Sequence, residues 1–394
     1  MSKSAKSVLL YIILFGSMFL FGFIENIKGV SYPLIKTEFG ISYEQQGVMV
    51  SLLAISYVAF CFIGGIIIGS LGVKKAFISG FVLMITGLIS VFFMPGFWPV
   101  AVFLLVVFAG FGLFEVSSNA LATQVFTKKA ALLMSLLHFF YGVGASLSPR
   151  VSGAITLNIS WRYLYLFSVP LVLLIFIPSL IARFPRSDEE QYGVKKAGFF
   201  TALKTPMVWV FSLGLGFMVA VELSSSNWGS LYFFDVYNLD PKTKGAAFIS
   251  NFYILFTVSR LLSGFAIEKI GYLRSLFIGV IASIIILAIG FFLGANGIYV
   301  LPVLGFFTAI LWPTIIATAM GYFKNDAPVM TSAIIVIGGA LNSGVQYLMG
   351  LANRIAGPAW GYRSSVLYAV LAVIVLIILA RGMRRPYANG AVPE

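Results

Sequence analysis

The sequence predicts an all-α membrane protein with twelve transmembrane helices, arranged as two pseudo-symmetric six-helix bundles. Three observations lead to this prediction: an apolar composition, apolar runs long enough to cross a bilayer, and a pattern that recurs at the same place in each half. Hydrophobic residues make up 60% of the chain and charged residues 10%, whereas soluble domains carry about 25% charged residues. We therefore expect lipid, rather than water, to surround most of the chain.

The apolar runs have the length of membrane spans. A transmembrane helix needs about 20 predominantly apolar residues to cross the hydrocarbon core. Helices are expected because backbone groups in lipid must be hydrogen-bonded within their own segment, and because these runs lack the alternation of barrel strands. The predicted spans are 8–31, 45–70, 76–96, 98–125, 130–156, 162–183, 206–236, 245–267, 273–294, 298–323, 330–352 and 362–381.

One long polar stretch, 184–205, interrupts the apolar pattern near the middle of the chain. It separates six predicted spans from the next six. We therefore predict an N-terminal bundle over 1–183, a cytoplasmic linker over 184–205 and a C-terminal bundle over 206–394.

The basic residues indicate the orientation of the spans. With the N-terminus inside, Lys and Arg in the inner loops outnumber those in the outer loops nearly threefold, as the positive-inside rule requires. We expect a multi-pass protein of the cell membrane with both termini in the cytoplasm. The net charge of +13 is spread in ones and twos between apolar runs, so it indicates membrane topology and no nucleic-acid partner.

A short glycine-bounded turn occurs twice. Gly65–Lys75 closes the second predicted span, and a similar pattern beginning at Gly264 closes the eighth, 199 positions later. Both copies place basic residues just beyond a tight turn. The turn resembles the signature loop of the major facilitator superfamily, although the first copy has Gly69 and Ser70 where that family usually has Asp and Arg. The resemblance covers nearly the whole chain and implies gating roles for Lys74, Lys75, Arg260, Glu268 and Lys269.

Three acids lie deep inside predicted spans: Glu25 in the first, Glu115 in the fourth and Glu222 in the seventh. A carboxylate in lipid is costly unless it is paired, protonated or facing water. One interpretation is a structural pair or a polar contact between helices. The other is a proton-coupling group, because burial favours the neutral form and allows a carboxyl to load and release a proton.

Polar residues accompany two of these acids. Ser118 and Asn119 follow Glu115 by three and four residues, which places them on its helix face. Asn227 and Trp228 follow Glu222 in a similar arrangement. Polar faces on spans from both halves are expected to form a common cavity wall suited to a hydroxyl-rich ligand.

Four segments resemble the fucose–galactose–glucose:proton symporters. They contain Gly110, Gly112, Glu115 and Asn119 in span four, Ala220 and Glu222 in span seven, Trp312–Ile315 in span ten, and Gly338–Gly339 in span eleven. One position departs from that branch. Its aspartate before the proline of span one corresponds here to Gly29, while Glu25 lies one turn earlier with Lys28 three residues away. Glu25 is therefore either a functional acid or half of an internal pair with Lys28.

Other residues complete the predicted site. Asn342 and Gln346 share a face of span eleven, and Trp312 and Trp228 are candidates for stacking on a sugar ring. His138 and Tyr141 lie three residues apart on span five. The lone histidine and single cysteine give no metal site or disulfide framework, and no phosphate-binding glycine loop is present. No metal, cofactor or ATP drive is expected.

The leading hypothesis is a monomeric secondary transporter that couples protons to the symport of a sugar or similar polyhydroxylated solute. It would operate by alternating access about a midplane site. A proton-driven antiporter of drugs or lipophilic compounds is the alternative within the same superfamily. A membrane enzyme or a sensor is a further alternative, but the sequence shows no nucleophile, cofactor loop or additional soluble domain.

Overall fold

The computed structural model describes residues 3–127, 130–185 and 201–384, and no strand occurs among them. The chain divides into two compact units. The first contains residues 1–41, 52–193 and 241–250, and the second contains residues 42–51, 194–240 and 251–394.

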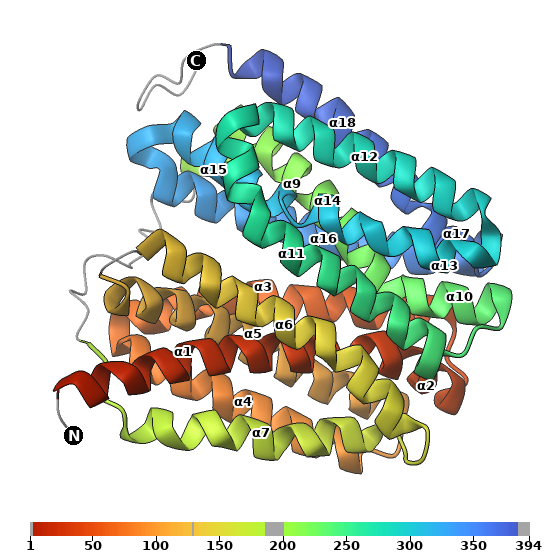
Figure 1. Ribbon diagram of the computed structural model, residues 1–394, viewed down its shortest axis with the longest axis horizontal. Coiled ribbons are helices and arrows are strands. Elements are labelled where there is room, and N and C mark those ends of the chain that lie inside the picture. The colour runs from red at the N-terminus through yellow and green to blue at the C-terminus, as the bar shows by residue number, and fades with distance from the viewer. Residues whose placement is uncertain (1–2, 128–129, 186–200, 385–394) are drawn as a thin grey trace. The chain divides into compact units, whose positions relative to one another are not determined.

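The first unit is built from long helices that run side by side (Figure 1). Helix α1 packs on α6 and α7, and α4 packs on α5 and α7. The helices are α1 (Lys3–Glu25), α2 (Lys28–Phe39), α3 (Tyr43–Leu71), α4 (Val73–Phe93), α5 (Phe97–Val125), α6 (Ala130–Thr156) and α7 (Arg162–Ile181).

The second unit repeats this plan with more interruptions. Helix α9 packs on α16 and α18, and α12 packs on α14, α15 and α18. The elements are α9 (Pro206–Ser224), a π-helix (Ser225–Gly229), α10 (Ser230–Tyr237), most of α11 (Ala246–Ile270), α12 (Tyr272–Phe292), α13 (Gly297–Val300), α14 (Leu304–Thr308), α15 (Leu311–Phe323), α16 (Ala327–Ala356), α17 (Trp360–Arg363) and α18 (Ser365–Gly382). A second π-helix (Pro241–Gly245) precedes α11 and belongs to the first unit.

The packing pairs correspond between the two halves of the chain. The contact of α1 with α6 matches that of α9 with α16, and the contact of α4 with α5 matches that of α12 with α14 and α15. The same holds for α4 with α7 and α12 with α18. The prediction of two pseudo-symmetric helical bundles is thus confirmed.

The described residues contain 11 segments long and apolar enough to cross a membrane. One of them, Gly294–Ala356, has 63 residues, enough for two spans of about 20 residues. A 3₁₀ turn at Lys324–Asp326 divides it, which accounts for the predicted spans ten and eleven. The first segment, Val8–Phe39, extends beyond the predicted span of 8–31.

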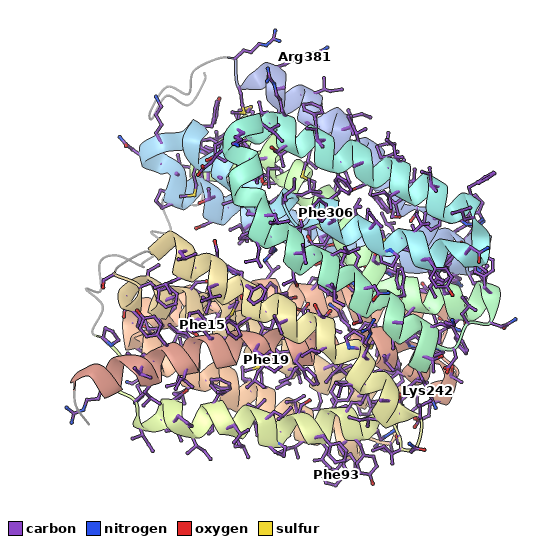
Figure 2. All side chains as sticks on the ribbon, in the orientation of Figure 1. Phe15, Phe19, Phe93, Lys242, Phe306 and Arg381 are labelled. Carbon is purple, nitrogen blue, oxygen red and sulfur yellow. The ribbon has the colours of Figure 1, made fainter. Side chains whose placement is uncertain are left out.

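Large apolar side chains cover the outside of the helices. Phe93, labelled at the edge of Figure 2, is 66% exposed, and Phe292 is 89% exposed. Inside the first unit, Phe77, Phe81 and Phe114 contact one another with ring centroids 5.2–5.5 Å apart. Apolar residues therefore occupy both the interior and the surface, as lipid solvation allows.

Two segments group with the unit opposite to their neighbours in sequence. Residues 42–51, at the start of α3, belong to the second unit, and 241–250 belong to the first. The predicted bundle limits, 1–183 and 206–394, remain a prediction. Most of the predicted linker, residues 186–200, lies outside the described residues.

The two signature turns adopt matching conformations. Gly72, between α3 and α4, has φ +85°, and Gly271, between α11 and α12, has φ +91°. Residues that carry a side chain rarely adopt a positive φ angle, so glycine is favoured at both positions. The two glycines are 199 residues apart, the spacing of the repeat in the sequence.

Candidate functional site

The first membrane span is broken at its buried polar residues. Helix α1 ends at Glu25, Asn26 and Ile27 form a turn, and α2 begins at Lys28. Asn26 is fully buried, and its amide nitrogen donates to the Gly22 carbonyl at 2.9 Å. Its Oδ1 has no hydrogen-bond partner among the described residues. Broken helices at membrane depth characterise binding sites of secondary transporters.

Glu25 is held by two side chains at this break. Lys28 Nζ lies 3.0 Å from Glu25 Oε1, and Tyr141 Oη donates to Oε2 at 2.7 Å. The Lys28 and Glu25 side chains are only 6% and 15% exposed. The ion pair considered from the sequence is therefore present. Tyr141, predicted to bind solute, reaches Glu25 from α6, where His138 lies one turn earlier and half-buried.

Glu115 forms a second polar group in the same unit. Asn119 Nδ2 donates to Glu115 Oε1 at 2.9 Å, and both residues are half-buried. Ser118 is fully buried, and its hydroxyl has no hydrogen-bond partner among the described residues. Helix α3 passes so close to α5 that a Cβ on Gly112 would collide with the Tyr57 carbonyl. Tyr57 lies within electrostatic range of both Glu25 and Glu115, so the two acids share a neighbour.

The seventh span is irregular at the position equivalent to the break in the first. Adding the 199-residue repeat to Asn26 gives Ser225, the first residue of the π-helix Ser225–Gly229. A single turn of π-helix frequently occurs at functional sites because it releases backbone groups and redirects side chains. The two halves therefore place polar residues at matching irregular turns.

Gln346 of α16 joins the polar residues of this turn. Its Oε1 accepts hydrogen bonds from Asn227 Nδ2 at 3.2 Å and from Trp228 Nε1 at 2.9 Å. Its Nε2 donates to Asn342 Oδ1 at 3.2 Å. All four residues are buried. Four residues predicted individually as solute contacts thus form one hydrogen-bonded network.

The remaining predicted residues of the second unit lie outside this network. Glu222 is half-buried near the end of α9. Trp312 is 37% exposed and lies next to Pro313 at the start of α15. Neither residue is one of the hydrogen-bond partners of Gln346 given above.

Two tyrosines that the sequence analysis missed anchor the irregular turns. Ser31 of α2 shares a hydrogen bond with Tyr165 at 2.9 Å, and Ser225 shares one with Tyr362 at 2.8 Å. The partners are 134 and 137 residues apart in sequence. No local motif could have revealed these pairs, although the repeat would have suggested that one implies the other.

The residues with predicted gating roles have different surroundings. Lys74 Nζ donates to the carbonyls of Leu180 and Ala182, both at 2.7 Å, and thereby caps the end of α7. The Arg260 guanidinium lies 4.5 Å from the centroid of the Phe256 ring. Lys75, Glu268 and Lys269 are exposed.

The first turn of α3 makes further polar contacts within the second unit. Tyr43 Oη donates to Asp235 Oδ2 at 2.8 Å, and Glu44 forms an ion pair with Arg354. In the first unit, Ser250 Oγ donates to the Ser146 carbonyl at 2.5 Å. These contacts join segments from the two halves of the sequence.

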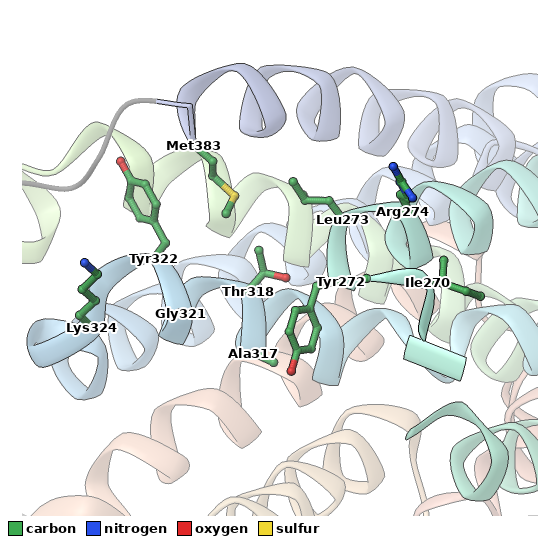
Figure 3. Close-up of a pocket in the computed structure, with 11 residues that line it drawn as sticks. Ile270, Tyr272, Leu273, Arg274, Ala317, Thr318, Gly321, Tyr322, Lys324 and Met383 are labelled. Atoms are coloured by element: carbon green, nitrogen blue, oxygen red, sulfur yellow. The ribbon is translucent and has the colours of Figure 1, made fainter. Parts of the chain in front are cut away.

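A cavity of about 650 Å³ lies at the second signature turn. Figure 3 shows Arg274 and Lys324 near its two ends, with Tyr272 and Thr318 between them. None of the residues predicted to bind solute lines this cavity. It is therefore separate from the polar clusters at the irregular turns.

The chain has the features of a polytopic membrane transporter fold. These features are many apolar spans, a duplicated helical bundle, and polar clusters at two equivalent irregular spans. Residues 14–345 match the Major Facilitator Superfamily. Because this match covers most of the chain, the protein belongs to that superfamily.

Individual proteins of known name are also similar to this chain. A putative glucose/galactose transporter of Helicobacter pylori is 25% identical over 370 residues, covering 83% of this chain and 86% of the relative. The L-fucose-proton symporter of Escherichia coli is 23% identical over 428 residues, covering 96% and 94%. A crystal structure of the E. coli fucose:proton symporter superposes with a TM-score of 0.67 at 18% identity, covering 96% of this chain and all of that one. The resemblance inferred from spans four, seven, ten and eleven is confirmed.

Proposed function

We propose that this protein is a secondary active transporter that couples proton movement to the symport of a sugar or a similarly polyhydroxylated solute. The observation that carries the proposal is the pair of partly accessible carboxyl groups, Glu25 and Glu115, in the middle of membrane spans. The relatives named as sugar transporters and a sugar–proton symporter support it. The drug antiporter considered as an alternative has no such support.

Each polar cluster suits one part of this task. Glu115 would carry the coupled proton, with Glu222 and Glu25 as further candidates. Asn119, Ser118, His138 and Tyr141 in the first unit would meet solute hydroxyls. In the second unit, Asn227, Trp228, Asn342 and Gln346 offer amide and indole groups, and amides both donate and accept hydrogen bonds. Trp312 offers an accessible ring for stacking.

Alternating access would expose the bound solute to one side of the membrane at a time. Lys74, Lys75, Arg260, Glu268 and Lys269 lie around or before the signature turns, where they would contribute to closure on the cytoplasmic side. The protein would reside in the cell membrane with both termini inside and would act as a monomer with protons and solute as its partners.

Transport by purified protein in liposomes tests the proposal. Addition of a transported sugar outside should carry protons inward and acidify the lumen, and an imposed inward proton gradient should drive sugar accumulation. An antiporter would instead move protons against the direction of its solute. Absence of proton movement with any sugar that the protein binds would contradict the coupling.

A further inference from the structure

Lys28 is a buried cation in the middle of the first membrane span. The residue is 5% exposed, and its ammonium group contacts Glu25 at 3.0 Å and lies 5.9 Å from the centroid of the Phe108 ring. Among the residues that the structure describes, Glu25 is the only acid that contacts it. Tyr141 Oη also donates to Glu25, and the phenols of Tyr32 and Tyr57 lie in the vicinity of its carboxylate.

The pair is neutral only while Glu25 is ionised. Removing one partner of a buried ion pair leaves an uncompensated charge, which is strongly unfavourable. Charge in the membrane interior is particularly costly. If Glu25 accepts a proton, Lys28 keeps its positive charge and loses its counter-charge. Protonation at this position therefore creates a demand for an anion next to Lys28.

We infer that the solute itself carries that anion, and that Lys28 determines specificity for a hydroxylated carboxylic acid such as a hexuronate. This inference rests on the proposed function, because it needs a solute and a coupled proton in the same cycle. Among the candidate acids of the proposed function, we place the coupled proton on Glu25 rather than on Glu115. In the loaded state the solute carboxylate then replaces Glu25 as the partner of Lys28. No covalent bond forms or breaks.

The balance of charge makes this arrangement self-consistent. One proton and one monoanion enter together, so the Lys28 region has the same net charge before and after loading. A neutral sugar entering with a proton would leave the Lys28 charge unbalanced. The ammonium group also offers three hydrogen-bond donors to a carboxylate. Lys28 thus provides a physical reason for this chain to take an acidic solute, unlike relatives whose names state glucose, galactose or fucose.

A paired binding panel tests the inference. D-Glucose and D-galactose are compared with D-glucuronate and D-galacturonate, using purified wild-type protein and titration calorimetry. At about pH 5.5 we expect the uronates to bind at least about tenfold more tightly than the sugars, because a higher proton concentration favours the loaded state. At about pH 7.5 this preference should shrink, because ionised Glu25 competes for Lys28.

Variants separate the role of Lys28 from general stability. Glu25→Gln imitates the protonated acid and should bind uronates tightly at both pH values. Lys28→Gln should lose the uronate preference, and Lys28→Arg should restore part of it. The double variant Glu25→Gln with Lys28→Gln contains no buried charge at this pair, so it should fold and lack the preference. Lys204→Gln, an exposed lysine of the second unit, is the matched control and should behave as wild type.

Electrical recording on supported membranes gives an independent readout. Uronate transport with one proton should acidify the lumen without net charge movement, whereas sugar–proton symport moves one positive charge each cycle. If sugars and uronates bind equally well in the wild type, and sugar uptake moves one charge per proton, the inference is wrong and the proposed function stands. If no sugar or uronate is bound or transported, the proposed function fails together with the inference.

Discussion

Gly47 of α3 and Gly350 of α16 pack backbone to backbone within the second unit. A Cβ added to Gly47 would lie 3.0 Å from Gly350 Cα, and one added to Gly350 would lie 2.7 Å from Gly47 Cα. The Tyr43–Asp235 hydrogen bond and the Glu44–Arg354 ion pair lie beside this contact. In the first unit, a Cβ on Gly153 would collide with the carbonyl of Lys242, which is 199 residues after Tyr43. Near these equivalent positions, each copy of the repeat therefore contacts a glycine that allows close helix packing.

Substitution of Gly350 by Ala should weaken this contact. The added methyl group has no room, and overpacking of this kind typically costs about 1–3 kcal/mol. We expect a lower unfolding temperature and, if the contact changes during the transport cycle, slower solute counterflow. Gly344→Ala is the matched control, because nothing lies within 4 Å of a Cβ at that position of the same helix. Equal counterflow rates for the two variants would show that the contact has no role in the cycle.

Glu115→Gln tests proton coupling. The amide imitates a permanently protonated acid and can still bond to Asn119. If Glu115 carries the coupled proton, solute binding and counterflow exchange should persist while accumulation driven by a proton gradient is lost. That result would place the coupled proton on Glu115, whereas the inference for Lys28 requires it on Glu25. Undiminished accumulation by Glu115→Gln would assign the proton to another acid, with Glu222 and Glu25 tested next.

Gln346→Leu should disrupt the network of the second unit. It leaves Asn227 Nδ2, Trp228 Nε1 and Asn342 Oδ1 without their partner. Each buried polar group left unpaired costs about 1–3 kcal/mol, so we expect a clearly lower unfolding temperature together with weaker solute binding. Trp228→Phe removes one donor and leaves Gln346 with its other two partners, so its effect should be smaller. A Gln346→Leu variant as stable as wild type would argue against the network.

The orientation of the chain is testable without a solute. A reporter fused after Thr201 should behave as a cytoplasmic protein, since the inner loops carry the larger number of basic residues. A reporter fused after Gly96, between the third and fourth spans, should behave as an external one. Reversal of both signals would invert the predicted topology, and the same signal from both would contradict the number of spans between them.

Much of the fold follows from the sequence because membrane spans are specified locally. About 20 apolar residues bury themselves in lipid whatever the rest of the chain does, so the spans and their two-fold repeat were predictable. The turns at Gly72 and Gly271 were also predictable, because their glycines and basic neighbours recur 199 residues apart. The polar residues of the candidate site were visible for the same reason, since a buried carboxylate or amide is conspicuous in an apolar run.

The partners of those residues were decided only by tertiary packing. Glu25 was recognisable as an acid that could pair with Lys28, but its bond to Tyr141 spans 116 residues. Gln346 accepts hydrogen bonds from residues 118 and 119 positions away, and local periodicity carries no information on such distances. Even the break at Asn26 and the π-helix at Ser225 interrupt runs that read as continuous helix. Packing of neighbouring helices, including the tyrosines that hold Ser31 and Ser225, provides the hydrogen bonds that make these irregular turns possible in lipid.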